Sequence, residues 1–84
     1  MDRKAIIAAV GITSKKVENG VELFCGKKKI GRLEGIKGAV RFHYPRGSEY
    51  KHTTAWGQEL TDEYIESCMF DAAARRIMEA QREW

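Results

Sequence analysis

The sequence predicts an α+β domain: a four- or five-stranded antiparallel sheet with a long C-terminal helix packed on one face, and a short N-terminal helix. Three observations support this fold class. Glycine-containing turn signals divide residues 12–56 into short segments rich in β-branched and aromatic residues. Residues 61–84 instead repeat apolar side chains at helical spacing. The 84 residues, 43% hydrophobic and 32% charged, have the size and composition of a single globular domain spanning residues 1–84.

The first expected element is a short helix that begins after Asp2 and ends before Gly11. Asp2 can accept hydrogen bonds from the first backbone amides of the helix. Gly11 suits the left-handed conformation that commonly ends a helix, and Ile12 is expected to contact the helix from beyond it. The apolar side chains of this helix share one side: Ile6, Ile7 and Val10.

Four turn signals separate the strands of the expected sheet. Asn19-Gly20 is the strongest, because this pair favours a two-residue hairpin turn. The other signals are GKK at residues 26–28, GIKG at 35–38 and PRGS at 45–48. Ile30 and Leu33 are out of phase with strict alternation, and a bulge at Gly31 would bring both side chains to one face.

Residues 61–84 form the clearest element, a helix that Thr61 is placed to cap. Asp62 and Glu63 lie in its first turn, where the positive end of a helix favours carboxylates. One stripe of apolar side chains is expected to cover the sheet: Ile65, Met69, Ala73, Ile77, Ala80 and Trp84. Charged side chains on the other side can pair three or four residues apart: Asp71, Arg75, Glu79 and Arg82.

The segment RFHYPRGSEYKHTTAW, residues 41–56, concentrates aromatic rings, histidines and cations in one hairpin. If PRGS is a four-residue loop, Tyr44 pairs with Glu49 and His43 pairs with Tyr50. Alternation then turns one set of side chains toward the helix: Val40, Phe42 and Tyr44. It leaves the opposite set exposed to solvent: Arg41, His43, Tyr50, His52 and Trp56.

Positive charge is concentrated in the expected sheet. Residues 1–60 hold twelve Lys/Arg and six Asp/Glu, whereas residues 61–84 hold three and six, which together give the net charge of +3. Beside the exposed hairpin face, the turns and strands add further cations: Lys27, Lys28, Lys29, Arg32 and Arg46. A basic sheet and an acidic helix indicate an anionic partner for the sheet.

Rings interleaved with cations can stack on bases and neutralise phosphates, as sequence-tolerant nucleic-acid surfaces do. The sequence therefore favours a binding module for nucleic acid or for a nucleic-acid-binding protein complex. A purely protein partner fits the same residues, and lysine-rich turns also serve simply to keep sheets soluble. As a short chain without motifs, the protein is similar in style to phage-encoded inhibitors, anti-CRISPR proteins among them. That likeness implies a phage or mobile-element inhibitor that blocks a host protein complex. Either a monomer or a homodimer is compatible with the sequence.

No pattern in the sequence indicates catalysis, a metal or a cofactor. Cys25, His43, His52 and Cys68 are spaced by 18, 9 and 16 residues, which matches no zinc-ligand signature. No glycine pattern fits a phosphate cradle. The two cysteines are expected to be small buried side chains in a reducing cytosol, and no segment reaches the ~20 apolar residues of a membrane span. We therefore expect a non-enzymatic cytoplasmic protein.

Two family resemblances bear on the mode of binding. The helical segment FDAAARRI, residues 70–77, behind a sheet is similar to the plant AP2 and integrase arm-type DNA-binding domains. That resemblance implies a sheet that enters the major groove with the helix packed behind it. The order helix, strands, helix also resembles the double-stranded RNA-binding domain. Those domains place lysines at the start of the second helix, where this chain reads TDEY, so phosphate contact is not expected there.

Overall fold

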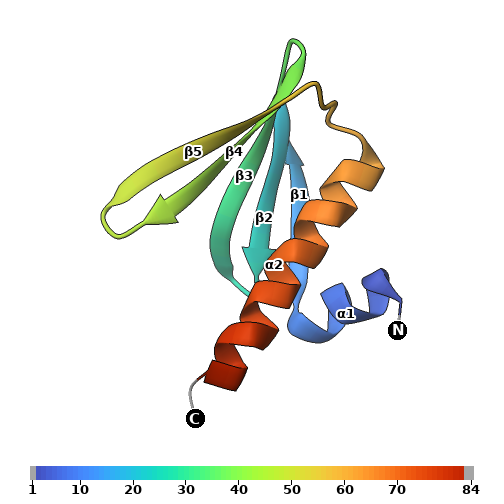
Figure 1. Ribbon diagram of the computed structural model, residues 1–84, viewed down its shortest axis with the longest axis vertical. Coiled ribbons are helices and arrows are strands. Elements are labelled where there is room, and N and C mark those ends of the chain that lie inside the picture. Colours follow the sequence, from blue (N-terminus) through green and yellow to red (C-terminus); the bar gives the residue numbers. More distant parts are fainter. Residues whose placement is uncertain (1, 83–84) are drawn as a thin grey trace.

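The computed structural model describes residues 2–82. Its elements are α1 (Arg3–Val10), β1 (Ile12–Val17), β2 (Gly20–Cys25), β3 (Lys28–Ile36), β4 (Ala39–Arg46), β5 (Glu49–Trp56) and α2 (Asp62–Arg82). The strands form one antiparallel sheet in chain order, β1-β2-β3-β4-β5. In Figure 1, α2 crosses this sheet with α1 beside it, and the β4–β5 hairpin projects away from α2. The α+β fold is confirmed, with five strands.

The short N-terminal helix forms as expected. The Asp2 side chain accepts a hydrogen bond of 3.1 Å from the Lys4 amide, and Gly11 ends α1 in the left-handed conformation, with φ 86°. Ile7 of α1 is buried together with Ile12 of β1 and Ala73 of α2. This small cluster, which is separate from the main core described below, holds α1 against the long helix α2.

The turn between β1 and β2 lies one residue earlier than the Asn19-Gly20 signal suggests. Val17 pairs with Gly20, so the turn residues are Glu18 and Asn19, and Asn19 takes the positive φ of 64°. Gly20 is instead the first residue of β2. A Cβ at Gly20 would overlap the carbonyl oxygen of Leu33, so this glycine is required by the close approach of β3.

The predicted bulge is present where β2 meets β3. Leu23 pairs with Gly31 but the next residue, Phe24, pairs with Lys29, which leaves Ile30 as the extra residue. The bulge allows both Ile30 and Leu33 to pack in the main core. A Cβ on Gly31 would lie 2.6 Å from the Phe42 ring, so glycine also leaves room for that ring.

The register predicted for the β4–β5 hairpin is wrong by two residues. His43 pairs with His52 and Tyr44 with Lys51, because the turn consists only of Gly47 and Ser48 and β4 continues through Arg46. Gly47, at φ 64°, permits this tighter turn. Since side chains alternate with a period of two, a shift of two leaves every residue on its predicted face.

The main core lies between the sheet and the N-terminal half of α2. Leu23, Leu33 and Val40 are its largest fully buried side chains. Ile65 and Met69 of α2 pack against them. Neither helix within residues 2–82 has the length and apolar character needed to cross a membrane.

The predicted stripe of α2 covers the sheet only in its first half. Thr61 caps the helix by accepting a 3.1 Å hydrogen bond from the Tyr64 amide, as expected. Ile65, Met69 and Ala73 join the core clusters, but Ile77 is 42% exposed and Ala80 is exposed, because α2 continues past the end of the strands (Figure 1). Trp84 and the side chain of Arg82 lie outside the part of the chain that the structure describes.

The packing of α2 against the sheet predicts how much two alanine substitutions lower the free energy of unfolding. Leu33→Ala removes a fully buried side chain from the centre of the core and should lower the free energy of unfolding by about 2–5 kcal/mol. Ile77→Ala, on the exposed half of α2, is the matched control and should cost less than about 1 kcal/mol. Urea denaturation followed by circular dichroism measures both. Equal losses for the two variants would contradict the placement of α2.

Candidate binding surfaces

The sheet face opposite the helices is open to solvent, and we call it the outer face. No helix within residues 2–82 packs on it (Figure 1), because both helices pack on the other face. Pairing and alternation place the following residues there: Thr13, Lys15, Val17, Gly20, Glu22, Phe24, Lys29, Arg32, Glu34, Ile36, Ala39, Arg41, His43, Pro45, Tyr50, His52, Thr54 and Trp56.

The structure divides the residues predicted to bind a partner between two sides of the sheet. Seven of them share the outer face: Lys29, Arg32, Arg41, His43, Tyr50, His52 and Trp56. Lys27 lies in the β2–β3 turn. Lys28 and Arg46 instead line a groove on the helix side of the sheet, and Lys29 borders both surfaces. The predicted set is thus one continuous outer surface plus cations that belong to another surface.

Two glutamates neutralise part of the positive charge on the outer face. Glu22 forms an ion pair of 2.6 Å with Lys29. The Lys29 ammonium, by its hydrogen bond, lowers the pKa of the Glu22 carboxyl below its ordinary value. Glu34 lies 3.4 Å from His43 Nε2 and 3.8 Å from Arg32 Nη1. The sequence predicted the cations but not the cross-strand pairs of Glu22 with Lys29 and of Glu34 with His43.

The β4–β5 part of the outer face carries the exposed rings. Tyr50 is 62% exposed and Trp56 is 74% exposed. The His43 and His52 rings lie 5.9 Å apart, tilted by 49°. Arg41 is held in place by a 3.5 Å hydrogen bond that its Nε donates to Thr54 Oγ1. Flat rings and a positioned guanidinium therefore lie on one ribbon of the sheet.

A second surface is the groove between the C-terminal half of α2 and the β4–β5 hairpin, which we call the basic groove. It has a volume of about 560 Å³. Its charged lining comprises Lys28, Lys29, Arg46, Arg75, Arg76 and Glu79. Phe42 and Tyr44 also line it, with their rings stacked 5.6 Å apart at an interplanar angle of 21°. Five cations and one carboxylate line the groove together with this stacked pair, and one of the cations, Lys29, is also paired with Glu22.

The bulge in β3 accounts for the basic groove. Pairing between β3 and β4 begins at Arg32 with His43, so the hairpin beyond His43 pairs only with itself. A bulge bends its strand and increases the local twist. In Figure 1 the β4–β5 hairpin diverges from α2 on this side. The diverging hairpin leaves the half-buried rings of Phe42 and Tyr44 facing the groove, although Phe42 also packs against the main core.

Sequence reasoning missed Arg75 and Arg76 as site residues. It assigned Arg75 to the solvent side of α2, paired with Asp71 or Glu79, but no such ion pair forms within residues 2–81. At helical spacing Arg76 falls within the predicted apolar stripe, whereas Arg75 falls outside it, on the solvent side of α2. Helical spacing could therefore have placed Arg76 beside the sheet, but it gave no such signal for Arg75.

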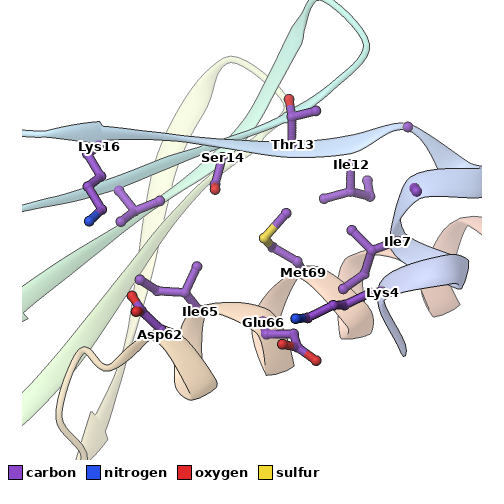
Figure 2. Close-up of a pocket in the computed structure, with 13 residues that line it drawn as sticks. Lys4, Ile7, Ile12, Thr13, Ser14, Lys16, Asp62, Ile65, Glu66 and Met69 are labelled. Carbon is purple, nitrogen blue, oxygen red and sulfur yellow. The ribbon is translucent and has the colours of Figure 1, made fainter. Parts of the chain in front are cut away.

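A third hollow, of about 530 Å³, lies below the free edge of β1 and is drawn in Figure 2. The close-up shows Ile7, Ile65 and Met69 along it, with Ser14 and Lys16 pointing from β1 toward α2. Ser14 and Lys16 occupy β1 positions that face the helix, where β2 carries leucine and valine. This hollow is therefore a gap in the packing at the sheet edge, with charges of both signs around it.

The described residues contain no cluster of metal-ligating side chains, and Cys68 is poorly suited to act as a nucleophile. No group of three His, Cys, Asp or Glu side chains within residues 2–81 could hold a metal ion. Cys25 and Cys68 are both free and, contrary to expectation, only half-buried. Burial raises the pKa of the Cys68 thiol. A raised pKa disfavours the thiolate that nucleophilic chemistry requires.

No protein family, curated protein or solved structure matches this chain. The geometry and charge of the outer face and the basic groove are therefore the features that bear on function.

The environment of Cys68 makes a prediction about reactivity. In a Cys25→Ser background, folded protein should react with iodoacetamide at neutral pH at least about tenfold more slowly than protein unfolded in urea, because its thiolate is scarce and half-buried. The rate in the folded state should rise as pH approaches the raised pKa. Alkylation at the same rate in both states would contradict this environment.

Proposed function

We propose that this protein is a non-enzymatic binding module whose outer face engages nucleic acid. The observation that carries the proposal is the exposure of Trp56 and Tyr50 on a helix-free face that also carries Arg41. Tyrosine and tryptophan are enriched in interaction surfaces relative to the rest of a protein surface. Bases stack on such rings regardless of sequence, since every base has an aromatic face.

The charge of the outer face supports an anionic partner. Four Lys/Arg and two Glu lie on it, an excess of two positive charges without counting the histidines. The excess is unevenly spread, because Glu22 and Glu34 pair with groups on β3 and β4. Arg41 has a neutral hydrogen-bond partner in Thr54 and keeps its full charge available for a phosphate. We further propose that the protein acts in the cytoplasm.

A second candidate function is inhibition of a host protein complex by a small phage or mobile-element protein. The observation that favours it is an apolar row at one end of the outer face. Ala39 is buried and pairs with Ile36 on one side and Trp56 on the other. An exposed tryptophan beside apolar neighbours is typical of an anchor residue in a protein interface.

Fluorescence anisotropy with a labelled oligothymidine of about 12 nucleotides separates these functions. If the outer face binds nucleic acid, affinity should fall at least tenfold between about 50 and 200 mM salt, because each phosphate contact releases counterions. Trp56→Ala and Tyr50→Ala should each weaken binding by about fivefold or more through lost stacking. Absence of binding at about 10 μM protein in low salt would reject the nucleic-acid function and favour the protein-binding inhibitor.

Glu34→Gln tests the same function through an expected gain, rather than a loss, of nucleic-acid affinity. The substitution removes a carboxylate that lies beside Arg32 and His43, so nucleic-acid affinity should increase about two- to fivefold. Glu59→Gln, which removes the same charge from the exposed segment before α2, is the control and should have a smaller effect. Weaker binding by Glu34→Gln would mean that the carboxylate itself contacts the partner, as in a protein interface.

A further inference from the structure

The basic groove holds more positive charge than folding alone explains. Arg75 and Arg76 precede the end of α2 at Arg82 by six or more residues, so the negative end of the helix does not account for them. No carboxylate within residues 2–81 forms an ion pair with Arg75, Arg76 or Arg46. Like charges that face one another across a groove repel. A bound anion would relieve this repulsion.

The guanidinium groups of the groove are suited to phosphate. Arg76 donates one hydrogen bond of 3.3 Å from Nη1 to the Ala72 carbonyl oxygen, which fixes its head group and leaves other donors free. Arg46 is exposed at the end of β4, across the groove from α2. Arginine presents several N–H donors in a planar fork that matches phosphate oxygens.

The stacked pair of Phe42 and Tyr44 favours single-stranded over double-stranded nucleic acid as the ligand of the basic groove. Both rings are half-buried between the cationic walls, so a ligand must enter the groove to reach them. In a duplex the faces of the bases are buried against one another, and only phosphates and sugars would meet the groove walls. In a single strand the bases are free to stack on aromatic side chains.

We propose that the basic groove binds single-stranded nucleic acid, with phosphates contacting Arg46, Arg75 and Arg76 and a base stacked on Tyr44. This inference rests on the proposed function and specifies the form of nucleic acid bound. The groove and the outer face lie on opposite sides of the same β4–β5 hairpin. One single-stranded nucleic acid can therefore contact both surfaces by passing around the tip of the hairpin.

The test compares two charge-neutralising double variants. Arg75→Gln with Arg76→Gln removes two cations from the basic groove, and Lys4→Gln with Lys16→Gln removes two from the hollow below β1. With labelled oligothymidine at about 100 mM salt, the groove variant should lose at least about tenfold in affinity and flatten the salt slope by about 1.4. The control should stay within about threefold of the unsubstituted protein, and a duplex of the same length should bind more weakly than the single strand. Thermal melts establish that both variants fold.

The outcomes separate the two proposals. If Trp56→Ala weakens binding but the Arg75/Arg76 variant binds like its control, the basic groove is rejected and the outer-face function stands. If the Arg75/Arg76 variant loses affinity and Trp56→Ala does not, the groove is supported and the outer face is not the binding surface. Tighter binding of duplex than of single strand would overturn the proposed form of the ligand, and absence of binding by the unsubstituted protein would overturn both proposals.

Discussion

The packing of α2 against Leu23, Leu33 and Val40 is the contact on which the rest of the structure depends. Within residues 2–82, α2 is the one long helix, and it can bury only one face of the sheet. The other face is therefore left to solvent. An open sheet face is common when antiparallel strands alternate apolar and polar side chains, but here the open face also carries a tryptophan and a tyrosine.

The width of the sheet explains where the hollows form. Five strands about 4.8 Å apart span roughly 19 Å, whereas a helix with its side chains is about 10 Å wide. A single helix over the centre leaves both edges of the sheet uncovered. At the β1 edge, α1 and the polar residues Ser14 and Lys16 border a shallow hollow. At the other edge, the bulge at Ile30 directs the β4–β5 hairpin away from the helix and opens the basic groove.

The local features of the fold could be read from single residues. Asp2, Gly11 and Thr61 act at helix ends through contacts to adjacent backbone, which sequence alone specifies. The bulge near Gly31 followed from the phase of Ile30 and Leu33. The β4–β5 register did not follow, because a four-residue and a two-residue turn are both compatible with PRGS. The sheet face predicted for each residue of β4 and β5 was nevertheless correct, because the two registers differ by an even number of residues.

The candidate site was predictable only where it depends on strand alternation. That rule placed Arg41, His43 and Tyr50 together on one face. The pairs of Glu22 with Lys29 and of Glu34 with His43 depend on contacts between separate strands, so the sequence could not reveal them. The basic groove depends on the angle between α2 and the hairpin, which is a property of the whole fold. For this reason Arg75 could be recognised as a site residue only in the structure, although helical spacing could have placed Arg76 beside the sheet.

The binding of single-stranded nucleic acid at the outer face and the basic groove can be mapped by NMR. The measurement follows the backbone amide and tryptophan indole shifts during titration with an unlabelled oligothymidine. We expect saturable shifts concentrated in β4 and β5, including the Trp56 indole, and extending into the C-terminal half of α2. Shifts confined to α1, β1 and the first turns of α2 would place the binding site at the hollow in Figure 2. That result would contradict binding at the outer face and the basic groove.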